Sequence, residues 1–356
     1  MAYKYKLNCL LFGLLISFLL ICLQGFSQTD FSEADQLLKQ NQKLLGNNLV
    51  ALVWKDGKIV YQKQLEKEAG DFNAKTQLPI QTCSQWLTAA LVMTFVDQGK
   101  LSLDDKVSKY IPIFATYMKS YITLRNCLTN TTGIQADPAG PMKLLQKSKF
   151  PSLEDEVNSF ASKREIQSNP GTEFYYSHTG PNIAGRVLEI VGKKSFDRLM
   201  QERILRPLKM RGTSFANDEG GAVNPSGGAV STANDYMNFL IMLLNKGEFQ
   251  GKKILSEKAV AEMETVQFQQ LPVRYTPRGS EGLHHLMGAW IQEVDARGNN
   301  AAVMSSLNLS GNWPFIDKCR NYAAVFFIKT PESEPKKEIY LSFKDAIDKQ
   351  FSSSCR

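Results

Sequence analysis

Ile80-Gln81-Thr82-Cys83-Ser84-Gln85-Trp86-Leu87-Thr88-Ala89-Ala90 lies in a stretch of 21 residues, Thr76 to Val96, that contains no charged side chain. Its second half, from Trp86 to Val96, is apolar on nearly every helical face, which is typical of a helix buried on all sides. A membrane-spanning helix is the alternative reading, and the many Gln, Thr and Ser side chains argue against it. The stretch therefore predicts a central helix enclosed by the rest of the fold.

This helix is followed by short motifs in a recognisable order. They are, in chain order, Val96-Asp97-Gln98-Gly99-Lys100-Leu101-Ser102-Leu103-Asp104-Asp105, Ile122-Thr123-Leu124-Arg125, Leu128-Thr129-Asn130-Thr131-Thr132-Gly133, Asn169-Pro170-Gly171, Arg206-Pro207-Leu208-Lys209-Met210 and Gly227-Gly228-Ala229-Val230-Ser231-Thr232. Over about residues 35 to 330 the pattern resembles the serine β-lactamase and penicillin-binding-protein family. The branch that it resembles most contains class C-like β-lactamases, DD-peptidases and esterases.

The resemblance implies an α+β fold of the β-lactamase/transpeptidase-like type, an antiparallel sheet flanked by helices together with a mostly helical lobe. We expect one domain over residues 29–356, with an α/β lobe over about 29–100 and 235–356 and a helical lobe over about 101–234. The chain itself predicts a hairpin over 49–62, because Asp56-Gly57 supplies the turn. The sequence also predicts helices over about 30–45 and 344–351. Strands are predicted over about 287–294, 301–307 and 322–328.

The first catalytic position of the family is altered in this chain. The family's helix opens with S-x-x-K, in which Ser attacks an acyl carbonyl and Lys, one turn later, helps to take its proton. Thr82 and Gln85 stand at these two positions. The amide of Gln85 cannot accept a proton at neutral pH and so cannot replace the lysine as a base. The alternative to a catalytic role is that Thr82 caps the helix and that Gln85 is a neutral residue without a function in catalysis. Cys83 is a further candidate nucleophile, but it is rotated by about 100° around the helix.

The second position is the family's Tyr-x-Asn motif, and it reads Tyr176-Ser177-His178 here. Tyr176 is retained, whereas His178 replaces the Asn that holds the substrate amide. An imidazole titrates near pH 7, so His178 could act as a new base. The alternative is a histidine tolerated at the rim of an abandoned cleft.

The third position is Lys-Thr-Gly or His-x-Gly in the family. Matching Gly311 and Ile316-Asp317 to its end places Ser306-Leu307-Asn308 on the motif, and Met304-Ser305-Ser306 is a second possible register. Neither register holds a cation, an imidazole or the motif's Gly. The pair His284-His285 precedes it, at an expected strand entrance, and without a third ligand it is weak evidence for a metal.

The first 28 residues resemble an export signal, with Lys4 and Lys6 ahead of an apolar run from Leu7 to Leu23. An uncleaved membrane anchor is the alternative. We expect a periplasmic or extracellular protein without a stable membrane span after cleavage. The formal net charge of +7 is spread over the chain and does not indicate a nucleic-acid partner. Beyond the signal, four cysteines allow three pairings or none, and Cys83 and Cys127 are expected to be free and buried.

Taken together, the replaced nucleophile, base and amide-binding residue predict a catalytically inactive homologue, a pseudoenzyme. It would act as a binding or regulatory module for a peptide, a cell-wall fragment or another acyl ligand. The expected ligand-binding residues are Trp86, Ser306 and Asn308, and Thr82, Gln85, Tyr176 and His178 stand at the catalytic positions. The alternative is a weak esterase or amidase that uses Thr82 with Tyr176 and His178. Neither reading implies a cofactor or a metal, and the oligomeric state stays open.

Overall fold

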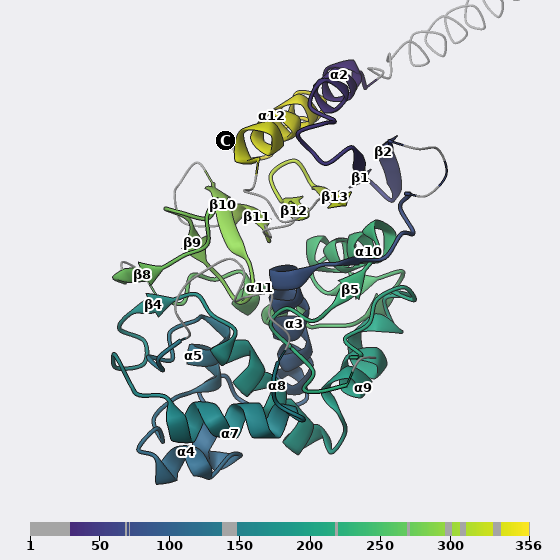
Figure 1. The fold of residues 1–356 in the computed structure, drawn as a ribbon. Helices are drawn as coiled ribbons and strands as arrows, with labels where there is room; N and C mark the ends of the chain where they lie inside the picture. The colour runs from purple at the N-terminus through teal and green to yellow at the C-terminus, as the bar shows by residue number, and fades with distance from the viewer. Residues whose placement is uncertain are drawn as a thin grey trace, which may run out of the picture.

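A seven-stranded antiparallel sheet organises the molecule (Figure 1), in the order β2-β1-β13-β12-β11-β10-β9. The computed structural model describes residues 29–67, 70, 72–136, 148–217, 220–268, 271–295, 301–306, 311–329 and 336–355. The strands are β1 (Asn48–Lys55), β2 (Lys58–Leu65), β9 (His284–His285), β10 (Trp290–Val294), β11 (Ala301–Ser305), β12 (Trp313–Asp317) and β13 (Tyr322–Lys329). Three two-stranded sheets pair β3 (Leu78–Pro79) with β5 (Val230–Ser231), β4 (Phe174–Tyr175) with β8 (Val273–Tyr275), and β6 (Glu248–Phe249) with β7 (Lys252–Lys253).

The predicted hairpin and its distant partner strand are both present. Asp56 and Gly57 turn the chain with φ of 48° and 86°, the left-handed backbone that an Asp-Gly turn supplies. β1 then pairs along its whole length with β13, from Asn48 opposite Lys329 to Lys55 opposite Tyr322. Segments from the early and the late part of the chain thus form neighbouring strands of one antiparallel sheet, which confirms the predicted fold class.

Both faces of the sheet are buried, and successive side chains of a strand enter opposite cores. In β1, Leu49, Ala51 and Val53 pack on the side of α2 and α12, whereas Val50 and Leu52 pack toward α3 and α10. The alternation follows from the two-residue repeat of a strand. Figure 1 shows α2 (Ser32–Gln40) and α12 (Lys337–Asp348) side by side on one face and α10 (Ala233–Leu244) on the other.

The remaining helices lie below the sheet in the view of Figure 1. Most of them come from the middle of the chain, where the sequence predicted a helical lobe; the lobe boundaries near residues 100 and 235 stay a prediction. The elements are η1 (Gln81–Cys83), α3 (Ser84–Asp97), η2 (Val107–Lys109), α4 (Ile113–Thr116), α5 (Leu124–Leu128), α7 (Leu153–Lys163), α8 (Thr179–Gly192), α9 (Phe196–Met200), the π-helical turn η3 (Gln201–Leu205) and α11 (Glu257–Met263).

The central helix α3 is enclosed as the uncharged stretch predicts. All of its residues from Ser84 to Phe95 are buried. It contacts the helices α8, α9 and α11 and the turn η3. A helix with this surrounding needs apolar residues on every face, which is why the sequence shows no polar stripe.

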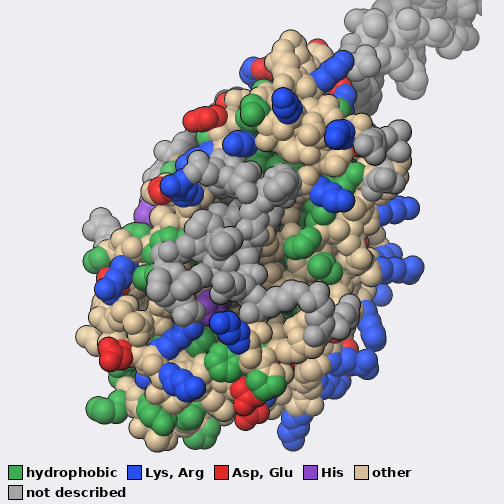
Figure 2. Space-filling model, viewed as in Figure 1, with side chains coloured by type: hydrophobic (Ala, Val, Ile, Leu, Met, Phe, Trp, Pro, Cys, Tyr) green, Lys and Arg blue, Asp and Glu red, His purple; other side chains and the backbone are tan. Residues whose placement is uncertain are grey.

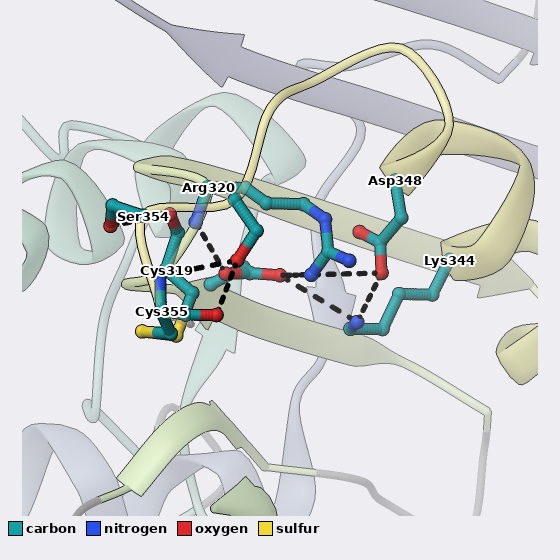
Figure 3. Close-up of a disulfide and its surroundings, with 8 residues drawn as sticks. Cys319, Arg320, Lys344, Asp348, Ser354 and Cys355 are labelled. Carbon is teal, nitrogen blue, oxygen red and sulfur yellow. Dashed lines mark hydrogen bonds and ion pairs between the residues drawn. A yellow bond between two sulfur atoms is a disulfide. The ribbon is translucent and has the colours of Figure 1, made fainter. Parts of the chain in front are cut away.

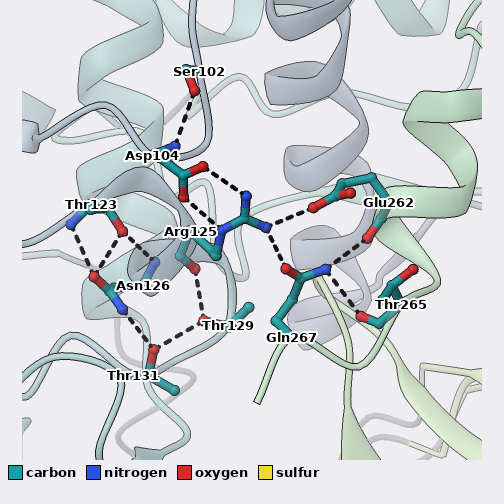
Figure 4. Close-up of polar contacts among 10 residues, drawn as sticks. All are labelled: Ser102, Asp104, Thr123, Arg125, Asn126, Thr129, Thr131, Glu262, Thr265 and Gln267. Atoms are coloured by element: carbon teal, nitrogen blue, oxygen red, sulfur yellow. Dashed lines mark hydrogen bonds and ion pairs between the residues drawn. The ribbon is translucent and has the colours of Figure 1, made fainter.

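Arg125 on α5 ties the helical region to the segment that returns to the sheet (Figure 4). Its Nε donates to Asp104 Oδ1 at 2.8 Å, and its Nη1 donates to Glu262 Oε1 at 2.6 Å and to the side chain of Gln267. Glu262 belongs to α11, 137 positions later in the chain. The hydrogen bonds to Asp104 and Glu262 raise the pKa of the guanidinium, with burial opposing them.

A disulfide joins Cys319, in the turn between β12 and β13, to Cys355 at the end of the described chain (Figure 3). Ser354 reinforces the junction, because its N and its Oγ both donate to the Cys319 carbonyl. Nearby, the buried Lys344 of α12 forms ion pairs with the buried Asp317 and with the partly buried Asp348. This pairing was left open by the sequence, whereas Cys83 and Cys127 are free and buried as expected.

Several element boundaries predicted from the sequence are wrong. The last helix runs from Lys337 to Asp348 rather than over 344–351, because its apolar residues from Tyr340 onward already pack on the sheet. The first helix ends at Gln40 and turns follow to Gly46. The strand expected from Met287 begins only at Trp290, since Gly288 takes a left-handed φ of 81°.

The predicted signal over residues 1–28 lies outside the described residues. Among those described, no helix is both long enough and apolar enough to cross a membrane. Figure 2 shows Lys and Arg side chains spread from the top to the bottom of one face, including a row along its right-hand edge, together with scattered acidic side chains.

Candidate functional site

Thr82 lies in the short 3-10 turn η1, directly before α3. The residue at the N-cap of α3 is Cys83, whose side chain makes no capping hydrogen bond, so Thr82 does not serve as the cap of this helix. Gln81 precedes it with φ of 46°, a left-handed backbone that costs a non-glycine residue on the order of 1 kcal/mol. The start of α3 is therefore held in a strained conformation by its surroundings.

Contacts from three distant elements fix this turn. The Tyr236 hydroxyl of α10 donates to the Cys83 carbonyl at 2.9 Å, and the Ala229 N–H donates to Ser84 Oγ at 3.2 Å. Cys83 Sγ donates to the Ser306 carbonyl at 3.0 Å. The Cys83 thiol is buried, and burial raises its pKa to about 12. Cys83 is thus a neutral structural residue beneath strand β11 rather than a nucleophile.

Gln85, at the position of the family's base, is buried and held by two long hydrogen bonds. Its Nε2 donates to the Ser177 carbonyl at 3.5 Å, and its Oε1 accepts from Asn130 Nδ2 at 3.4 Å. Asn130 Oδ1 in turn accepts from the Ser177 N–H at 3.0 Å. The amide of Gln85 therefore occupies the space between two loops and offers no group that could take a proton from Thr82.

Tyr176 is adjacent to Thr82, and their side chains are hydrogen-bonded. The phenol is buried against Trp290 and His285, with ring centroids 5.4 Å and 5.6 Å away. Burial, with a smaller Coulombic contribution from Cys83, raises the pKa of Tyr176 well above its ordinary value near 10, although the bond with Thr82 opposes the shift. The phenol is protonated at neutral pH and is not a general base.

His178 stands apart from this contact. It is the N-cap residue of α8 and its ring meets Phe160 of α7 edge-on, with centroids 5.6 Å apart. The Arg164 guanidinium lies over the same phenyl ring, with its carbon 4.2 Å from the ring centroid. The structure therefore places Thr82, Gln85 and Tyr176 together, and it places His178 against the α7 helix.

The three predicted ligand-binding residues have different fates. Trp86 is 2% exposed and packs edge-on against Phe239 of α10, so it belongs to the core and does not face a ligand. Ser306 is buried directly after β11, and its carbonyl accepts from Cys83 Sγ at the start of α3. Asn308 lies outside the described residues.

Two further residues of this region have contacts that their motifs did not predict. Asn130 has a left-handed φ of 56° and links Gln85 to Ser177; it sits in the quoted motif Leu128–Gly133, which was the available signal. His285, on β9, lies among Phe174, Tyr176 and Trp290. Its sequence neighbourhood predicted a strand entrance but not these partners. Among the described residues, no group of three or more His, Cys, Asp or Glu side chains could hold a metal ion.

Gly288 is expected to be essential for this arrangement. A Cβ at this position would lie 2.5 Å from the carbonyl carbon and oxygen of Gln85 and 2.6 Å from the Trp86 N, all of them backbone atoms. We predict that Gly288→Ala lowers the free energy of unfolding by several kcal/mol, on the order of 3. Gly282→Ala is the matched control, since Gly282 has a similar φ of 77° and open space around it. Equal losses for the two variants, measured by urea unfolding, would refute the close contact.

The chain is similar in sequence and in fold to known proteins. A family model described as "Beta-lactamase" matches residues 35–341. A solved structure, a putative β-lactamase from Bacteroides dorei DSM 17855, is 26% identical with a TM-score of 0.79, and the alignment covers 90% of this chain and 99% of that one.

Two curated relatives match over shorter stretches. Protein flp of Staphylococcus aureus strain MW2 is 27% identical over 171 residues, 46% of this chain and 34% of its own length. A putative D-alanyl-D-alanine carboxypeptidase of Escherichia coli K12 is 25% identical over 209 residues, 54% of this chain and 48% of its own length. The matches thus span about a third to a half of these relatives.

Proposed function

The chain belongs to the β-lactamase family, and we propose that it is a member that has lost the family's hydrolytic chemistry and acts by binding. Its ligand would be a peptide, a cell-wall fragment or another acyl compound. The relatives' names, which include a putative β-lactamase and a putative D-alanyl-D-alanine carboxypeptidase, support this class of ligand.

The observation that carries the proposal is the environment of Gln85. Acyl transfer by a hydroxyl needs a base within hydrogen-bond reach of that hydroxyl. In the family this is a lysine; here it is an amide whose oxygen and nitrogen are engaged with Asn130 and Ser177. Tyr176, the other neighbour of Thr82, has a raised pKa and stays protonated. Neither Gln85 nor Tyr176 can therefore act as a base toward Thr82 at neutral pH.

Binding does not need these proton-transfer groups. A backbone N–H at the nucleophile position can donate to a ligand carbonyl whatever the side chain is. The turn that carries Thr82 is held by Tyr236 and Ser84, so its backbone is pre-ordered. The turn at Thr82 is ordered, and Gln85 stands where the family has its lysine base. This combination favours recognition of an acyl group over its hydrolysis.

A weak esterase or amidase is the second candidate, and one contact favours it. The side-chain hydrogen bond between Tyr176 and Thr82 could relay a proton if the phenol lost its own. The raised pKa of Tyr176 makes that ionisation costly at neutral pH. The position of His178 against Phe160 gives no support for its part in such a relay.

A covalent acyl-enzyme probe separates the two candidates. We expect a fluorophosphonate probe to leave the unmodified protein unlabelled, because Gln85 stands at the position of the family's lysine and the Tyr176 phenol stays protonated. Labelling would be read by intact-mass spectrometry, with Thr82→Ala and Thr265→Ala as a matched pair; Thr265 is an exposed threonine of the α11 end. Labelling that persists in Thr265→Ala and disappears in Thr82→Ala would establish the hydrolase and overturn the binding proposal.

Export is part of the same proposal. The positively charged start and apolar run within residues 1–28 support it. The disulfide between Cys319 and Cys355 adds weak support, since disulfides persist mainly in oxidising compartments.

A further inference from the structure

A cavity of about 170 Å³ lies beside the Tyr176 ring cluster, between β4, β8 and β9. Its apolar wall includes Phe174, Phe268, Leu271, Val273 and Trp290. For comparison, a cavity of about 150 Å³ in a protein core accommodates one benzene molecule. The space therefore suits a single aromatic ring with one substituent.

This cavity is separate from the positions that match the catalytic motifs. Thr82, Gln85, Tyr176 and His178 do not contribute to its lining. His285 and Trp290 stand between the two, since both line the cavity and both contact the Tyr176 ring. The inference drawn from the cavity is thus independent of the proposed function.

His285 presents polar atoms that the described part of the protein leaves unsatisfied. Its ring lies 4.7 Å from that of Trp290, 5.3 Å from Phe174 and 5.6 Å from Tyr176, measured between centroids. Both ring nitrogens are shielded from solvent, and neither has a hydrogen-bond partner among the described residues. A buried polar group without a partner costs about 1–3 kcal/mol, so a bound ligand that hydrogen-bonds to it would recover that loss.

A second unsatisfied group lines the same cavity. The Thr276 hydroxyl is buried and has no hydrogen-bond partner among the described residues. The other threonines of the wall differ from it: Thr129 Oγ1 donates to the Arg125 carbonyl at 2.7 Å and lies 3.0 Å from Thr131 Oγ1, as Figure 4 shows. Two polar side chains from different segments of the cavity wall therefore lack a hydrogen-bond partner among the described residues.

The charge of the wall limits the chemistry of that occupant. Among the described residues that line the cavity there is no Lys, Arg, Asp or Glu. Burial lowers the pKa of His285 to about 3, so its imidazole is neutral at physiological pH and offers one donor and one acceptor. A carboxylate or an ammonium group would be desolvated here without a counter-charge, which is unfavourable.

We propose that this cavity binds an uncharged aromatic molecule carrying one hydroxyl or amide group, with the size and polarity of phenol or benzamide. The ring packs between Phe174, Phe268 and Trp290, and the polar substituent exchanges hydrogen bonds with His285 and Thr276.

The proposal is tested by calorimetric titration of the full-length protein with phenol and benzamide. Saturable binding at one site is expected for both, and benzoate and benzylamine are expected to bind at least about tenfold more weakly because each places a charge in the cavity. His285→Phe preserves a ring among the aromatic neighbours and removes both nitrogens. Thr276→Val preserves the shape and removes the hydroxyl.

Each variant should weaken phenol binding by roughly threefold to tenfold, the effect of one lost hydrogen bond. Thr265→Val is the control, because Thr265 is exposed, already donates to the Ala261 carbonyl and does not line the cavity. If His285→Phe fails to fold, Thr276→Val alone decides. Absence of saturable binding, equal affinity for benzoate, or unchanged affinity in the folded variants would overturn the proposal.

Discussion

Restoring the nucleophile and the base together, with Thr82→Ser and Gln85→Lys, is expected to raise hydrolysis of a chromogenic β-lactam or a p-nitrophenyl ester by about 10⁴ to 10⁶ over the unmodified protein. Loss of a nucleophile or its base costs that range in catalytic triads, which corresponds to about 5–8 kcal/mol of activation free energy. The unmodified chain is expected to turn over neither substrate at the rate typical of its family.

The surroundings of Gln85 make the exchange feasible. A lysine at this position would find the Ser177 carbonyl, which now accepts from Gln85 Nε2, as a ready acceptor for its ammonium group. The single variants are the controls: Thr82→Ser alone lacks a base and Gln85→Lys alone keeps the hindered hydroxyl, so each should stay within about tenfold of the unmodified protein.

The measurement is steady-state hydrolysis followed by absorbance, with circular dichroism to verify folding. No gain in the folded double variant would mean that His178 and the third motif limit catalysis as strongly. Family-level turnover by the unmodified chain would contradict the pseudoenzyme outright.

Asp317→Ala is expected to be the most destabilising of the charge deletions near the disulfide, by about 3–5 kcal/mol. Asp317 is fully buried; its carboxylate accepts from the Arg320 N–H at 2.8 Å and from Arg320 Nη1 at 3.0 Å, and it lies 3.6 Å from Lys344 Nζ. Removing it takes this acceptor from the Arg320 N–H and Nη1 and removes one of three carboxylates from the buried ammonium of Lys344. Deleting one partner of a buried ion pair is costly.

The Lys344 ammonium remains charged in the folded protein. Burial lowers its pKa, but hydrogen bonds to Asp348 and Glu293 raise it more, so the net shift is upward. A raised pKa stabilises the fold below the ordinary lysine value and loses that contribution only as the pH rises through the folded value. The deficit of Asp317→Ala should therefore persist across neutral pH.

Urea unfolding at pH 7 measures this effect, and Asp345→Ala is the matched control. Asp345 is an exposed aspartate of the same helix, α12, and its loss should change the free energy of unfolding by about 0.5 kcal/mol or less. A similar midpoint for the two variants would show that the buried carboxylate adds little.

The sheet and the central helix could be predicted from the sequence because their signals are local. The Asp56-Gly57 turn and the alternating residues of β1 predict a hairpin, and the uncharged stretch around α3 predicts burial on all sides. Helix ends were predicted less well: α12 begins among Lys and Glu residues whose helical role depends on Tyr340 packing against β13 and Trp313. That contact joins segments distant in sequence.

In the site, too, local sequence predicts some features, and contacts between distant segments determine the others. The identity of the residues at positions 82, 85 and 176 follows from motif spacing, and the structure brings these three together. The bonds of Gln85 to Asn130 and Ser177 span 45 and 92 positions, and nothing in the local spacing announces them. Trp86 shows the same limit, because the sequence of an aromatic residue beside a catalytic motif is the same whether its side chain faces a ligand or packs, as here, against Phe239.

The Cys319–Cys355 disulfide also determines how the molecule responds to mechanical force. A force applied at residue 355 is transmitted through the covalent bridge to the turn between β12 and β13. The segment from residue 320 to residue 354 therefore does not bear this force. While the bridge is intact, α12 carries no tension and the load passes directly to the strands. After reduction, the same pull is resisted first by the two hydrogen bonds of Ser354, and once they break, α12 is the next element to be peeled from the sheet.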